Sequence, residues 1–151
     1  MTRRLLGVLH DSDEEAGFAP QPGIGELDAL AASVRAAGLP VNLVVGGDHA
    51  AVPAAVDVSV YRIVQEALTN ILKHAGRARA DVTIGCADDA VTIEITDDGT
   101  PKPGDRIPAG GRGLAGMRER AAIFGGELHA GPRPGRGFAV RARLPVGDGL
   151  S

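Results

Sequence analysis

The chain has 151 residues, which is enough for one domain with a hydrophobic core and too few to favour two. Its formal net charge of −3 does not favour a general nucleic-acid binder or a protein that binds anionic membranes. The single Cys86 excludes an intrachain disulfide and a cysteine metal cluster, and no apolar run reaches spanning length. We therefore expect a soluble, cytoplasmic domain that makes no membrane contact of its own.

The first 24 residues are predicted to be a linker that follows a preceding helix, since they change from basic and apolar to acidic and then to Pro/Gly-rich. His10 and Asp11 invite comparison with a phosphoaccepting pair, but Gly17 and Pro20 interrupt any helix after them. Residues 25–146 are expected to form the folded domain and residues 147–151 a disordered tail. The domain opens with a predicted helix at 26–37 and a short strand at 41–45.

The next predicted helix begins near residue 53 or 57 and ends near residue 75, and it contains YRIVQEALTNILKHA. Helical spacing places seven apolar side chains on one stripe: Val60, Ile63, Val64, Ala67, Leu68, Ile71 and Ala75. The same spacing places four polar side chains on one strip: Glu66, Asn70, Lys73 and His74. An ordinary solvated face explains this strip. A carboxylate, an amide and a cation also suit a phosphate chelated by Mg²⁺.

Residues 81–87 and 90–96 alternate apolar and polar side chains around an Asp88-Asp89 turn, which predicts a β-hairpin. The second strand leads directly into Asp97 and Gly99. A carboxylate here can accept a hydrogen bond from an exocyclic amine while the glycine lets a ring approach, which makes it a plausible anchor for adenine. The alternative is a common turn after a strand.

Residues 100–112 hold three prolines and several glycines, so we expect a mobile loop that would act as a lid over a nucleotide. A helix at 113–124 and two strands at about 127–130 and 137–144 complete the domain. Gly111 and Gly113 precede that helix, whose free N–H groups could meet phosphates, although glycine precedes many helices.

The succession of these motifs is more specific than any one of them. The strings YRIVQEALTNILKHA, ITDDG and GRGLAGMRERAAIFGGEL resemble the N, G1 and G2 boxes of histidine-kinase ATP-binding domains. The nearest subclass is the NarL-partner type of two-component sensor kinase, within the GHKL (Bergerat) ATPase superfamily, and the resemblance covers about residues 27–145. It implies an α+β fold, a two-layer sandwich in which about three helices cover one face of a mixed, mostly antiparallel sheet.

The resemblance also implies a role for each matching position. Asn70 would hold Mg²⁺ against the triphosphate of ATP, with Glu66 beside it as a catalytic or metal-side carboxylate. Asp97 would accept the adenine amine and Gly99 would admit the ring. Contacts with phosphate or ribose would come from Lys73, His74, Gly111, Arg112, Gly113 and Leu114. The phosphoacceptor histidine would belong to a separate dimerisation domain, and a response regulator would be the indirect partner.

Three positions depart from the family pattern. Pro101 stands where a second glycine is usual, Arg112 replaces the commoner histidine, and Phe138 replaces a threonine that helps to hold adenine. Two alternatives stay open. One, motivated by Pro101 and Phe138, is a degenerate GHKL module that serves as a docking or regulatory domain with weak or no ATP binding. The other is a serine kinase of the anti-sigma-factor kind on the same superfamily fold, against which the strings YRIVQEALTN and GLAGMRER argue.

Overall fold

The computed structural model describes residues 21–99 and 114–146. The expectations for the linker at 1–20, for the loop at 100–112 and for the tail at 147–151 lie outside these residues, and so do those for Pro101, Gly111, Arg112 and Gly113. The described residues form helices and strands in the order that the sequence predicts, with most boundaries within two residues of the expected ones. The elements are η2 (Ile24–Glu26), α2 (Leu27–Ala36), β1 (Val41–Gly47), η3 (His49–Ala51), α3 (Ala54–His74), β2 (Ala80–Cys86), β3 (Ala90–Asp97), α4 (Leu114–Ile123), β4 (Glu127–Pro132) and β5 (Phe138–Pro145).

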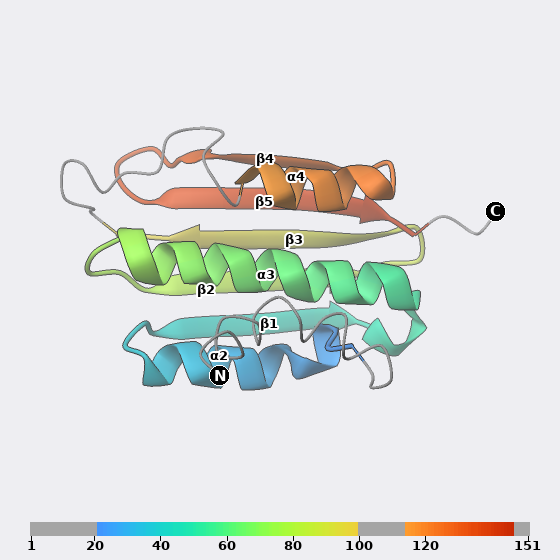
Figure 1. The fold of residues 1–151 in the computed structure, drawn as a ribbon, viewed down its shortest axis with the longest axis horizontal. Coiled ribbons are helices and arrows are strands. Elements are labelled where there is room, and N and C mark those ends of the chain that lie inside the picture. Colours follow the sequence, from blue (N-terminus) through green and yellow to red (C-terminus); the bar gives the residue numbers. More distant parts are fainter. Residues whose placement is uncertain (1–20, 100–113, 147–151) are drawn as a thin grey trace, which may run out of the picture.

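The five strands form one mixed sheet in the order β1-β2-β3-β5-β4 (Figure 1). Strands β1 and β2 are parallel, because α3, which connects them, carries the chain back to the end of the sheet where β1 begins. The other three pairs of neighbouring strands are antiparallel. Helices α2, α3 and α4 lie side by side on one face of this sheet (Figure 1). The α+β two-layer architecture expected from the sequence is therefore confirmed.

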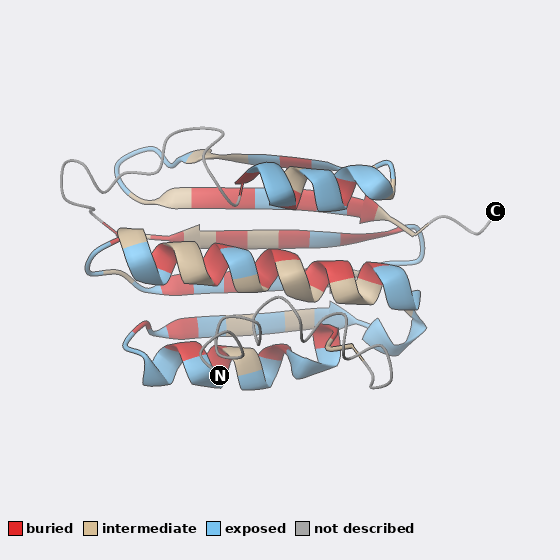
Figure 2. Cartoon of the chain, in the orientation of Figure 1, coloured by how far each residue is buried: buried red, intermediate tan, exposed pale blue. Residues whose placement is uncertain are grey.

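The hydrophobic core lies between the two layers. In β3, the residues Val91, Ile93 and Ile95 are buried at alternating positions, while Thr92 between them is exposed (Figure 2). All seven apolar residues of the predicted α3 stripe are buried. The apolar residues recur every 3.6 positions in the helix and every second position in the strands, and these are the positions that face the core between the two layers.

The other face of the sheet carries charged side chains at the alternate strand positions. Arg141 Nε donates to Glu94 Oε2 at 2.9 Å, and Arg143 Nη2 lies 3.4 Å from Asp89 Oδ2. Both pairs are largely exposed, so each contributes about 1 kcal/mol or less to stability. Arg141 and Arg143 are therefore solvent-facing strand residues, each with an acidic partner.

Gly23 and Ile24 are held to the rest of the domain by hydrogen bonds from their backbone N–H groups. The Gly23 N–H donates to Glu26 Oε1 at 2.6 Å, and the Ile24 N–H donates to Asp57 Oδ1 at 2.9 Å, in the first turn of α3. Ile24 is also buried in the core. The start of the described chain is thereby attached to the N-terminal end of α3.

Within residues 21–99 and 114–146, no helix is both long enough and apolar enough to cross a bilayer.

Candidate functional site

Asp97 is the last residue of β3, and only 4% of it is exposed. Its position in the strand alternation turns the side chain toward the helix layer, as the buried Ile93 and Ile95 are turned. The Gly99 N–H donates to Asp97 Oδ1 at 2.7 Å. Among residues 21–99 and 114–146, no hydrogen bond to Oδ2 accompanies the one that Oδ1 accepts.

Burial raises the pKa of Asp97 above the ordinary value of a carboxyl group, because desolvation penalises the charged form. The hydrogen bond from Gly99 lowers this pKa, the neighbouring Asp98 raises it, and the Arg133 guanidinium lowers it again. Among the described residues, the Gly99 N–H is the hydrogen-bond donor to the Asp97 side chain. In its ionised form the carboxylate can also accept a hydrogen bond from a ligand N–H, and its charge strengthens such a bond.

Gly99 brings this carboxylate next to the end of α3. A methyl group on Gly99 would overlap the carbonyl oxygen of Ala75, which is the C-cap of α3, and would lie 2.7 Å from the Ala75 Cβ. The Asp98 carboxylate, between them, accepts from the Arg79 N–H at 2.8 Å. The end of β3 and the end of α3 are therefore in direct contact, and both lie at the left of the molecule in Figure 1.

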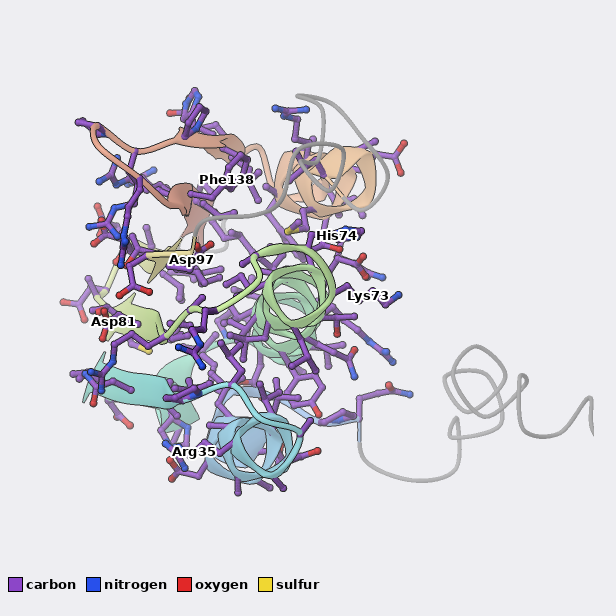
Figure 3. The ribbon with its side chains drawn as sticks, turned by 90° about the vertical axis from the view of Figure 1, so that its left-hand side faces the viewer. Arg35, Lys73, His74, Asp81, Asp97 and Phe138 are labelled. Atoms are coloured by element: carbon purple, nitrogen blue, oxygen red, sulfur yellow. The ribbon has the colours of Figure 1, made fainter. Side chains whose placement is uncertain are left out.

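The polar strip predicted on α3 lies in the last part of that helix. Glu66 and Lys73 are exposed, whereas Asn70 and His74 are half-buried. Figure 3 shows Lys73 and His74 in the helix layer and Asp97 and Phe138 in the sheet layer, at the same end of the molecule. Asp97 and the strip are thus brought to one end by the contact between Gly99 and Ala75 rather than being placed on opposite faces.

Helix α4 lies beside α3 (Figure 1). It begins at Leu114, whose side chain is buried in the core, and it packs against α3. The pKa of Arg62 in α3 is lowered by burial and, to a smaller extent, by the positive charge of Arg120 in α4. Because Arg62 precedes Glu66 by one helical turn, the strip lies on the side of α3 that faces α4.

The donors on α3 suit a magnesium ion that arrives with a nucleotide. Among the described residues, no three His, Cys, Asp or Glu side chains are grouped to hold a metal ion. Glu66 and Asn70 supply two hard oxygen donors one turn apart. Magnesium usually combines one or two protein ligands with substrate phosphates and water, so this pair fits a chelated phosphate better than a resident ion.

Phe138 lies directly beside Asp97. The two residues are paired across β3 and β5, so their side chains point to the same face of the sheet. Phe138 is half-buried against the core. Where the family pattern has a hydroxyl, this chain therefore presents an apolar ring next to the carboxylate.

Arg133 is a residue of this end that the sequence did not single out. It stands in the turn between β4 and β5, and its Nη1 donates to the carbonyl oxygen of Asp97 at 2.8 Å. No local pattern in the sequence links it to a residue 36 positions away. The turn composition GPRPGR was its only signal.

Comparisons with known proteins bear on this end of the molecule. A family model described as "Histidine kinase-, DNA gyrase B-, and HSP90-like ATPase" matches residues 55–148, which include α3, β3 and α4. The sensor histidine kinase LnrJ of Bacillus subtilis (strain 168) is 34% identical over 112 residues, covering 74% of this chain and 27% of LnrJ. The sensor histidine kinase YxjM of the same organism is 36% identical over 142 residues, covering 94% of this chain and 29% of YxjM.

A solved structure extends the likeness to three dimensions. The blue-light activated histidine kinase EL346 of Erythrobacter litoralis superposes with a TM-score of 0.64 at 26% identity, over 83% of this chain and 42% of that one. The chain spans less than a third of the length of LnrJ and of YxjM.

Proposed function

Because the chain belongs to the histidine kinase-, DNA gyrase B- and HSP90-like ATPase family, we propose that it binds ATP at the end of the molecule where α3 and β3 meet. The observation that carries this proposal is the buried Asp97 carboxylate at the end of β3, whose Oδ1 accepts a hydrogen bond from the Gly99 N–H. Oδ2 accepts a hydrogen bond from the exocyclic amine of adenine. The negative charge of the carboxylate makes this hydrogen bond stronger than one between two neutral groups.

The triphosphate lies toward α3 and α4. Asn70 and Glu66 would hold Mg²⁺, which would neutralise charge on the phosphates. The exposed Lys73 supplies a positive charge to phosphate oxygens, and His74 contacts phosphate or ribose. The remaining phosphate contacts are assigned from the family resemblance to Gly111, Arg112, Gly113 and the N–H of Leu114.

The activity that we propose is transfer of the γ-phosphoryl group to a histidine on a separate dimerisation domain. This matches the relatives LnrJ and YxjM, whose names describe sensor histidine kinases. The chain supplies positioning and charge for such a transfer, and we assign to Glu66 the role of the carboxylate that polarises the acceptor. A response regulator of the NarL type would be the indirect partner, and the domain would act in the cytoplasm.

Calorimetric titration with a non-hydrolysable ATP analogue and Mg²⁺ tests the nucleotide site. Asp97→Asn should weaken binding roughly 10- to 100-fold, because it replaces a charged acceptor. Asp81→Asn is the matched control, since Asp81 is exposed on the open face of the sheet (Figure 3) and the charge change is identical. Equal affinity of Asp97→Asn and Asp81→Asn would refute the adenine assignment.

The acceptor is tested separately. The protein is mixed with labelled ATP and a dimerisation domain that carries the histidine, and the labelled product is treated with acid. Phosphohistidine is acid-labile and phosphoserine is not, so an acid-stable product would favour the serine-kinase alternative.

A second candidate function is a regulatory or docking module that does not use ATP. Phe138 favours it, because an apolar ring beside Asp97 replaces a hydroxyl that helps to hold adenine in the family pattern. If millimolar nucleotide with Mg²⁺ produces neither heat nor chemical-shift changes in the wild-type protein, this candidate replaces the first.

A further inference from the structure

Arg133 connects the β4–β5 turn to the carboxylate that we assign to adenine. Its Nη1 donates to the Asp97 carbonyl oxygen at 2.8 Å, so the guanidinium is hydrogen-bonded to the backbone of that residue. We propose that Arg133 is a positioning residue that holds Asp97 in the orientation that recognises the 6-amino group of a purine. This inference rests on the proposed nucleotide site and adds a residue to it.

The turn that carries Arg133 is itself held against the end of β3. The Arg133 N–H donates to the Gly137 carbonyl at 3.0 Å, which closes the turn. Gly137 has a φ of +97°, and a side chain there would overlap the carbonyl oxygen of Asp97. The backbone of the turn thus lies against Asp97, close enough for the exposed Arg133 to reach the Asp97 carbonyl.

The hydrogen bond acts on the carboxylate through the Asp97 backbone. The backbone at Asp97 sets the direction of the Cα–Cβ bond, from which the carboxylate extends. The Gly99 N–H fixes Oδ1, and Arg133 fixes the backbone carbonyl of the same residue. The positive charge of Arg133 also favours the ionised form of Asp97, which is the form that accepts from an amine.

The opposing charge at this site is Asp98, which disfavours ionised Asp97. Loss of Arg133 would remove the positive charge that lowers the pKa of Asp97 and would leave the effect of Asp98, which raises this pKa, unopposed by it. A role in positioning therefore predicts a loss of purine discrimination, whereas a role confined to holding the hairpin predicts a loss of stability alone.

The experiment compares the affinity for ATP with that for purine riboside triphosphate, which lacks the 6-amino group. Arg133→Gln should reduce the preference for ATP roughly 3- to 30-fold, with little change in the binding of the purine riboside compound. Arg136→Gln is the matched control, because Arg136 lies exposed in the same turn and makes no hydrogen bond or ion pair with the described residues. Its ATP preference should equal that of the wild type.

An unchanged preference in Arg133→Gln, an equal loss of affinity for both nucleotides, or an equal effect of Arg136→Gln would overturn the inference. Should Arg133→Gln not fold, Arg133→Lys is measured instead. It keeps the charge without the planar fork, and it should lose part of the preference. If the wild-type protein does not prefer ATP, or if Asp97→Asn leaves that preference unchanged, the proposed adenine site is refuted. The inference about Arg133 is then refuted as well, because it depends on that site.

Discussion

Replacing Gly99 by Ala tests the contact that joins the end of β3 to the end of α3. The added methyl group would overlap the Ala75 carbonyl oxygen and lie 2.7 Å from the Ala75 Cβ. Because Ala75 is 7% exposed and its N–H donates to the Ile71 carbonyl at 3.0 Å, it cannot move without disturbing the last turn of α3. If residue 99 moves instead, the 2.7 Å hydrogen bond to Asp97 lengthens.

Either movement is unfavourable. Overpacking of this kind typically destabilises a protein by about 1–3 kcal/mol. With a urea slope of about 1–3 kcal/mol per molar, the unfolding midpoint should fall by roughly 1 M. Affinity for ATP should fall as well, because the displaced elements carry Asp97 and the polar strip of α3.

Urea unfolding followed by circular dichroism measures the first effect, and nucleotide titration measures the second. Gly116→Ala is the stability control, since it lies in α4 with no atom within 4 Å of the added methyl group. Alanine is favoured over glycine in helices, so this variant should be unchanged or more stable by up to about 1 kcal/mol. If Gly99→Ala keeps both its midpoint and its ATP affinity, the close approach of the two elements does not constrain the site.

Three further outcomes follow from the structure. The raised pKa of Asp97 means that its ionised form opposes folding near neutral pH. The stability of the wild type relative to Asp97→Asn should therefore increase as the pH falls through the folded-state pKa toward about 3.9, which urea midpoints at several pH values will measure; a decrease would reverse the sign. Asp57→Ala removes the acceptor of the Ile24 N–H, so amide exchange at Ile24 should accelerate and stability should fall by about 1–2 kcal/mol; wild-type protection would contradict this. Arg141→Gln breaks an exposed pair with Glu94 and should change the free energy of unfolding by less than about 1 kcal/mol; a larger loss would show that the pair is not a simple surface interaction.

The site was predictable from the sequence where it depends on local spacing. Glu66 and Asn70 lie one turn apart in α3, as their separation in the sequence requires. Asp97 ends β3 because the alternation of the hairpin continues up to it. The roles assigned to these residues in binding ATP and Mg²⁺ remain predictions for the experiments above.

The sequence also indicated Gly99 as a position where a ring could approach. In the structure, Ala75 at the end of α3 lies so close that any side chain at position 99 would overlap its carbonyl oxygen. Composition could not identify this neighbour, because the two residues belong to elements separated by a whole strand pair. The contact depends on how far α3 extends over the sheet before the chain turns into β2.

By itself, the sequence determined the elements, their order and the residues that face the core, because these follow from periods of two and 3.6 along the chain. Only the tertiary structure decided that Arg133 reaches the Asp97 carbonyl and that Phe138 lies opposite the same residue. Both contacts depend on the register between β3 and β5 and on the path of the β4–β5 turn. Register is set by packing across the whole sheet, so residues far apart in the chain meet without any local pattern that links them.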